Sequence, residues 1–143
     1  MVTQILAGFV GALTFSYIYR VPASQRMYAG AVGSLGWTIS LSARQGGGEL
    51  LGVFLAAIAV AVCSEVLARR RQQPVLVFLI PGVIPLVPGG KAYLTMLSFL
   101  QQDYVDAVGL LVSTILMAGA VAAGIIITSS TFRVYSRTKY LRR

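Results

Sequence analysis

The sequence predicts an all-α integral membrane protein with five transmembrane helices, the fourth of them broken by an unwound segment rich in proline and glycine. Hydrophobic residues make up 57% of the 143 residues and charged residues only 11%, whereas soluble domains are about 45–50% apolar and about 25% charged. The apolar residues fall into five runs, each close to the roughly 20 residues that cross a bilayer. We therefore expect residues 1–143 to form a single transmembrane domain.

The first two spans are expected at about residues 2–19 and 27–43. Span one carries glycines that allow close helix packing, and it lacks the positive n-region of a secretory signal. Span two is the most polar, and one part of it forms a candidate cavity wall: Gly33, Ser34, Trp37 and Thr38. The alternative for span two is tight packing, with its hydroxyl groups bonded back to carbonyls of the same helix.

The third span is expected at about residues 50–68 and contains Glu65, the only acidic residue within a span. Glu65 stands four residues before Arg69, which is the helical spacing of an ion pair. We therefore expect a structural pair near the cytoplasmic end, with proton coupling through Glu65 as the alternative.

The fourth span, about residues 75–100, contains the helix break. A proline lacks the amide hydrogen that a helix needs, and glycine accepts backbone angles that other residues avoid. The residues expected to break the helix are Pro81, Gly82, Pro85 and Pro88. An unwound stretch between Pro81 and Gly90 would lie near the middle of the span, so it must be buried in protein or line a watery cavity.

A half-helix that restarts after Gly90 would present free amides and a positive partial charge, and Lys91 would add a full charge there. This combination is suited to a carboxylate. The candidate substrate-binding residues are Pro85, Pro88, Gly89, Gly90, Lys91, Tyr93 and Thr95. The alternative is a structural kink in which Lys91 snorkels or pairs with an acidic group.

The fifth span, about residues 108–132, is rich in small residues, and a short basic tail, residues 133–143, follows it. Five crossings place ten of the twelve basic residues on one side: Arg20, Arg26, Arg69, Arg70, Arg71, Arg133, Arg137, Lys139, Arg142 and Arg143. The other side receives Arg44, Glu49, Asp103 and Asp106. Because basic loops stay cytoplasmic, the N-terminus is expected outside and the C-terminus in the cytoplasm.

The composition argues against other classes of protein. The chain has no histidine, and its single cysteine, Cys63, lies in an apolar run, so we expect no metal site, no cofactor and no catalytic residues. The net charge of +8 is spread between hydrophobic runs, where basic residues meet anionic lipid heads, so no nucleic-acid partner is expected. A channel and a scaffold remain as alternatives to a transporter.

The run IPGVIPLVPGGKAYLTM resembles the proline–glycine signature of the threonine/serine exporter family, specifically its five-span second half. Span two, GAVGSLGWTISL, is similar to the glycine-rich second helix of that family, and the basic loop before Gln73 and Pro74 falls where the family has a short loop. The signature places Pro-Gly before an aromatic residue, matched by Pro88, Gly89 and Tyr93, whereas Lys91 departs from it.

This resemblance covers nearly the whole chain and implies one subunit of a two-component exporter in a bacterial cell membrane. The partner would be a larger subunit that carries the other five membrane helices, with a homo-oligomer as the alternative. The implied substrate is threonine or serine, or a C4-dicarboxylate such as succinate. A subunit that supports its membrane partner without transporting is the remaining alternative.

Overall fold

The computed structural model describes residues 2–140, and all of its regular secondary structure within that range is helical. The elements are α1 (Val2–Ile18), α2 (Ala23–Arg71), α3 (Leu76–Val83), the short 3₁₀ helix η1 (Ile84–Leu86), α4 (Gly89–Leu100) and α5 (Tyr104–Tyr140). The predicted all-α class is confirmed. Within the expected basic tail, Arg142 and Arg143 lie outside the described residues.

Two spans that were expected to be separate form the single element α2, which has a kink at Gly48. The backbone there has φ 81° and ψ 169°, a region that only glycine occupies readily. The first arm of α2, residues 23–47, and the second arm, residues 49–71, therefore meet without a loop. The expected loop at residues 44–49 is wrong, because Gly48 turns the chain within a single residue.

Not every expected span is long and apolar enough to cross a bilayer. Gly46–Arg71 and Tyr104–Val134 meet that test, and Leu76–Leu86 together with Gly89–Leu100 forms one broken span bent by 46°. Helix α1 has 17 residues and is about 25 Å long, which is less than the roughly 30 Å of hydrocarbon. The structure thus supplies two to three candidate membrane spans among its described residues.

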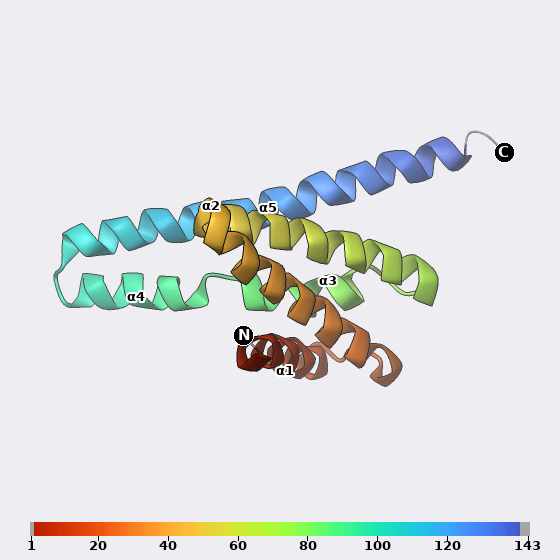
Figure 1. The fold of residues 1–143 in the computed structure, drawn as a ribbon, viewed down its shortest axis with the longest axis horizontal. Helices are drawn as coiled ribbons and strands as arrows, with labels where there is room; N and C mark the ends of the chain where they lie inside the picture. The colour runs from red at the N-terminus through yellow and green to blue at the C-terminus, as the bar shows by residue number, and fades with distance from the viewer. Residues whose placement is uncertain (1, 141–143) are drawn as a thin grey trace.

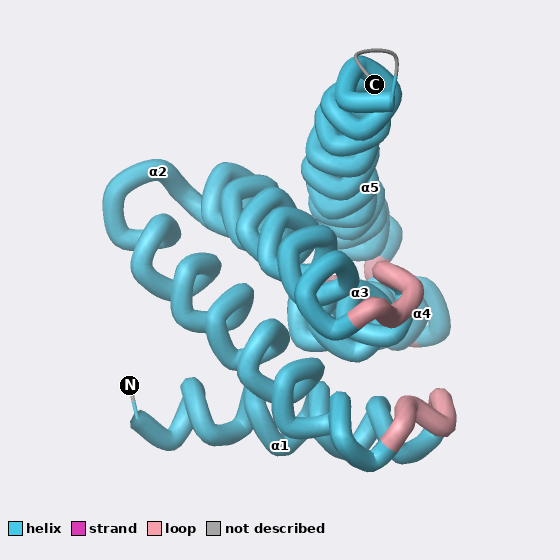
Figure 2. The backbone as a smooth tube through the Cα atoms, turned by 90° about the vertical axis from the view of Figure 1, so that its right-hand side faces the viewer, coloured by secondary structure: helices cyan, strands magenta, loops and turns pink. Residues whose placement is uncertain are grey.

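The long axis of the molecule follows α5 (Figure 1). Helix α4 lies beside the N-terminal part of α5, and the second arm of α2 packs farther along it (Figure 1). Figure 2 looks nearly along α5 and shows α1 lying across that direction, with the first arm of α2 above it. The α4–α5 turn and the C-terminal end of α5 therefore lie at opposite ends of the molecule.

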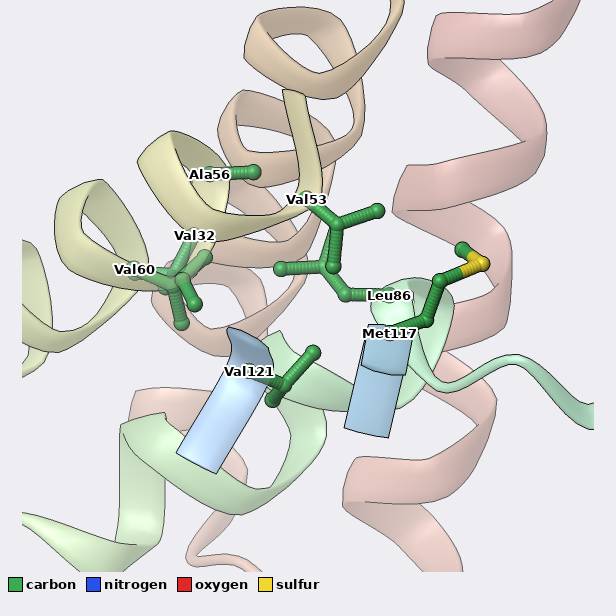
Figure 3. Close-up of a cluster of buried hydrophobic side chains, with 8 residues drawn as sticks. Val32, Val53, Ala56, Val60, Leu86, Met117 and Val121 are labelled. Carbon is green, nitrogen blue, oxygen red and sulfur yellow. The ribbon is translucent and has the colours of Figure 1, made fainter. Parts of the chain in front are cut away.

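The core lies where both arms of α2 meet η1 and α5. Its buried side chains include Val32, Val53, Val60, Leu86 and Met117 (Figure 3). Because lipid is as apolar as these side chains, close packing rather than hydrophobic burial must hold the helices together. Small residues therefore matter most at these contacts.

Glycines permit the closest helix contacts. A Cβ built on Gly36 would lie 2.4 Å from Cγ2 of Val60, and one on Gly33 would lie 2.4 Å from Cβ of Ala12. Neither position can hold a larger side chain without movement of a neighbour. The expected role of small residues in packing is confirmed at these positions.

The break in the fourth span is narrower than the sequence predicts. Pro81 and Gly82 are helical and buried within α3, and Pro85 lies in η1. Only Val87, with φ −65° and ψ 130°, and Pro88 separate η1 from α4. Pro81 is buried in a helix that packs on α2, and this packing offsets the one helical hydrogen bond that a proline removes, so an unwound stretch from Pro81 to Gly90 is not formed.

Candidate functional site: a polar cavity at the helix break

A cavity of about 190 Å³ lies where the kinked part of α2 faces the break in the fourth span. Three segments surround it: the kinked part of α2, the break between η1 and α4, and the middle of α5. The residues that line it are Trp37, Ser40, Arg44, Glu49, Val53, Pro85, Leu86, Val87, Pro88, Gly90, Lys91 and Met117. The cavity thus combines an opened backbone with several polar side chains.

Three charged side chains form a chain of contacts across this cavity. The Lys91 ammonium donates a hydrogen bond to Oε2 of Glu49 and another, of 3.0 Å, to the hydroxyl of Ser113. The Arg44 guanidinium lies 3.3 Å from the other carboxylate oxygen, Oε1. About a third of each side chain of this cluster is exposed: 33% for Arg44, 36% for Glu49 and 27% for Lys91.

Three polar atoms at the cavity are buried and have no hydrogen-bond partner within residues 2–140: Nε1 of Trp37, Oγ of Ser40 and Nε of Arg44. Ser40 is fully buried. A buried polar group left unpaired costs about 1–3 kcal/mol, so a site with three such atoms favours a bound polar group that satisfies them.

The first turn of α4 adds backbone donors to the same cavity. The amides at the start of a helix have no intrahelical acceptor and carry a positive partial charge. Pro88 caps α4 without a side-chain hydrogen bond. The Gly89 amide donates a 2.8 Å hydrogen bond to the carbonyl of Val87, so the amides of Gly90 and Lys91 remain as candidate donors. A Cβ built on Gly89 or Gly90 would meet nothing within 4 Å, so a ligand can approach the backbone here.

The structure brings some of the predicted substrate-binding residues together. Pro85, Pro88, Gly90 and Lys91 line the cavity, and Gly89 is the first residue of α4 beside them. These residues come from the two sides of the break. They share one site because the chain turns only at Val87 and Pro88.

Two other predicted residues do not line the cavity. Tyr93 is 67% exposed and is not among the residues that line the cavity. Thr95 is buried, and its hydroxyl donates a 2.8 Å hydrogen bond to the carbonyl of Lys91. Tyr93, two residues after Lys91, projects from another face of α4, whereas Thr95, four residues after Lys91, shares its face but lies one turn farther along the helix.

The predicted cavity wall on span two divides among three environments. Only Trp37 reaches the polar cavity. Ser34 donates a 3.3 Å hydrogen bond to the carbonyl of Ile5 in α1, and Thr38 donates one of 2.8 Å to the carbonyl of Ser34. Both line a separate, apolar groove between α1 and α2, whereas Gly33 packs against α1.

Sequence reasoning missed Arg44 and Glu49 as site residues because it placed them in an external loop. The run Gly46, Gly47 and Gly48 that separates them was the available signal. A positive φ at one of these glycines folds α2 back on itself and turns both charges toward Lys91. No pattern marked Ser40 or Ser113, whose positions depend on how the helices pack.

Glu65 lies far from the cavity. It forms the expected helical ion pair, with 3.3 Å between its carboxylate and the Arg69 guanidinium. The Arg69 guanidinium also lies over the Phe132 ring, 4.5 Å from its centroid. Nineteen helical residues separate Phe132 from Ser113, a distance of about 28 Å along α5, so Glu65 and the cavity lie at opposite levels of the membrane domain.

The comparisons with known proteins agree with the resemblance seen in the sequence. A family model described as "Threonine/Serine exporter, ThrE" matches residues 4–131. No curated protein and no solved structure matches the chain.

Proposed function

Because the chain belongs to the threonine/serine exporter family, we propose that it is a subunit of a secondary transporter that exports threonine or serine through the cavity at the helix break. Family membership makes this membrane protein a transporter with a role in amino-acid export, not an enzyme. The binding site, the partner subunit and the orientation in the membrane are proposals of our own.

The observation that carries this proposal is the group of hydrogen-bond donors gathered at the cavity. A substrate carboxylate can accept hydrogen bonds from the Lys91 ammonium and from the amides of the first turn of α4. Trp37 and Ser40 line the same cavity, and their buried Nε1 and Oγ atoms have no hydrogen-bond partner within the described residues. The volume of about 190 Å³ is below the roughly 300–1,000 Å³ of drug-sized pockets, as a small solute requires.

A larger five-span subunit of the same family is the partner that we propose. Arg44, Glu49 and Lys91 each expose about a third of their side chains, and charged groups at membrane depth do not face lipid. Another protein surface is needed to cover them and to complete a pathway. A second copy of this chain is the alternative partner.

The proposed topology has five spans in a bacterial cell membrane, with the N-terminus outside and the C-terminus in the cytoplasm. Its support is that several basic segments meet at one end of the molecule. The Arg71 guanidinium donates a hydrogen bond to the Tyr28 hydroxyl, and the Arg69 guanidinium covers the Phe132 ring. The α4–α5 turn, with Asp103 and Asp106, lies at the other end (Figure 1).

Cysteine labelling tests this topology. A cysteine in place of Asp106 should react with an impermeant reagent added outside intact cells, whereas one in place of Arg70 should react only after permeabilisation. The opposite pattern would reverse the orientation, and equal access from outside would remove the proposed span between the two positions.

Two alternatives to threonine or serine export keep the same site. A C4-dicarboxylate such as succinate also carries the carboxylate that the donors require. A scaffold role would make the cavity a contact with the larger subunit, so that variants at the cavity would alter assembly and leave substrate affinity unchanged.

Export of labelled threonine from cells in which the full chain is the only copy tests the proposal. Lys91→Ala should lower export at low internal threonine by about 10–100-fold, because a hydrogen bond to a charged group contributes about 1.5–3 kcal/mol. Tyr93→Phe is the control, since Tyr93 does not line the cavity. Wild-type export should saturate and exchange labelled for unlabelled threonine; ohmic flux, or full activity of Lys91→Ala, would contradict the proposal.

A further inference from the structure

We infer that Glu49 is the residue that recognises the substrate's ammonium group, and that a zwitterionic substrate binds by replacing the ion pair between Glu49 and Lys91. This inference rests on the proposed function. It concerns a residue that neither the predicted substrate-binding set nor the family signature includes.

The two oxygens of the Glu49 carboxylate have different partners. Oε1 lies 3.3 Å from the Arg44 guanidinium, whereas Oε2 accepts the hydrogen bond from Lys91. Arg44 can therefore hold the carboxylate in place while Lys91 leaves. Lys91 keeps its 3.0 Å hydrogen bond to Ser113 as an anchor on the other side.

An α-amino acid carries the two groups needed to replace this internal pair. Its ammonium can take the place of Lys91 on Oε2 of Glu49, and its carboxylate can take the place of Glu49 on Lys91. Lys91 exchanges the Glu49 carboxylate for the substrate carboxylate, and Glu49 exchanges the Lys91 ammonium for the substrate ammonium. The exchange therefore leaves no charge of the cluster unpaired, which is the condition for low cost in a poorly solvated site.

The unpartnered groups around the pair fit the rest of such a molecule. The fully buried Ser40 hydroxyl and Nε1 of Trp37 line the same cavity. Both atoms are buried, so a substrate would contact them only once opening of the Glu49–Lys91 pair had widened the cavity. They would then be donors for the carboxylate or for the side-chain hydroxyl that threonine and serine share.

Glu49 also discriminates against substrates that lack an ammonium group. A molecule with only a carboxylate can bind Lys91 but leaves Oε2 of Glu49 without a partner. A C4-dicarboxylate brings a second negative charge toward Glu49, and like charges repel most strongly where water is scarce. The arrangement therefore favours amino acids over dicarboxylates.

The test compares two solutes of nearly equal shape, threonine and 3-hydroxybutyrate, which lacks only the amino group. Export of each is measured from cells whose only copy of the full chain is wild-type, Glu49→Gln, Glu49→Asp or the control Asp106→Asn. The ratio of threonine to 3-hydroxybutyrate export should fall by about tenfold or more in Glu49→Gln, because a hydrogen bond to a charged partner is lost. Export of 3-hydroxybutyrate should rise, since Lys91 is released.

Glu49→Asp keeps the charge and should retain most of the preference for threonine, and Asp106→Asn should leave the ratio unchanged. Membrane levels of each variant are measured alongside, and a ratio does not depend on the amount of protein. Wild-type cells that export threonine together with an unaltered ratio in Glu49→Gln would overturn the inference and leave the proposed function standing. Absence of threonine export by the wild-type chain would instead overturn the proposed function.

Discussion

Glycine serves opposite purposes in two regions of this molecule. In the packed region, Gly36 lies against the second arm of α2 and Gly33 against α1, so closely that a Cβ added to either would lie 2.4 Å from a neighbouring atom. At the cavity, Gly89 and Gly90 face open space. The packed glycines bring helices together, whereas the cavity glycines leave backbone uncovered for a ligand. The same residue type therefore marks both the most and the least crowded parts of the fold.

The largest difference in stability is expected when one glycine of each region is replaced by alanine, which adds one methyl group. Gly36→Ala should destabilise the protein by about 1–3 kcal/mol, because the new methyl overlaps Val60, a buried side chain with little freedom at χ1. Gly90→Ala should leave stability unchanged or raise it by up to about 1 kcal/mol, while lowering threonine export. Thermal unfolding of the detergent-purified chain measures the first effect and cellular export the second.

A compensating substitution sharpens this test. In the double variant Gly36→Ala with Val60→Ala, the overlapping methyl of Val60 is absent, so the double variant should be more stable than the sum of the single effects. Strict additivity would show that the overlap between Gly36 and Val60 is not the cause. Loss of stability in Gly90→Ala would show that the cavity glycines are packed after all.

Trp37 belongs to both regions, and a single substitution can separate its packing against α1 from its role as a hydrogen-bond donor at the cavity. Its Cβ packs against Gly8, whereas its unpaired Nε1 lies at the cavity. Trp37→Phe keeps the aromatic contact and removes the donor. Threonine affinity should fall by about tenfold, as for one lost hydrogen bond to a charged group, and the unfolding temperature should change little. The concentration dependence of export measures affinity, and an unchanged half-saturation would place Nε1 outside the site.

The smallest effect is expected at the other ion pair. Glu65 and Arg69 form a pair at the basic end of the molecule, and 45% of the Arg69 side chain is exposed. Only 12% of the Glu65 side chain is exposed, and Arg69 also packs over Phe132, so the pair is part of a local contact between helices far from the cavity. Glu65→Gln should therefore leave the rate of threonine export and its pH dependence unchanged. An altered pH dependence would support proton coupling through Glu65 and move part of the mechanism away from the cavity.

Part of this site could be predicted from local pattern. Three prolines and two adjacent glycines within ten residues predict a helix break whatever the tertiary structure is. The break places Lys91 at the start of a new helix. The ion pair of Glu65 with Arg69 follows in the same way from a spacing of four residues. These features depend on neighbours in sequence, which is why they were predicted correctly.

Other features depended on contacts between distant segments. The sequence placed Arg44 and Glu49 in an external loop. Three adjacent glycines mark that segment, but no local pattern indicated that Gly48 would turn α2 back so that Glu49 meets Lys91, 42 residues later. Tyr93 and Thr95 were assigned to the site on proximity in sequence, but Tyr93 is exposed and Thr95 bonds back to its own helix one turn farther along. The width of the break was overestimated because packing of α3 on α2 keeps α3 helical through Pro81.

The sequence by itself determined that this is an all-helical membrane protein of the exporter family, with a break in its fourth apolar run and a lysine beside it. Composition, apolar runs and backbone chemistry are local properties, and they need no knowledge of the fold. Tertiary structure alone decided which charges share the cavity, which glycines are crowded and which polar atoms are left unpaired. Those properties arise only when helices from distant parts of the chain pack together, and they are the ones that make the cavity a candidate site for a zwitterion.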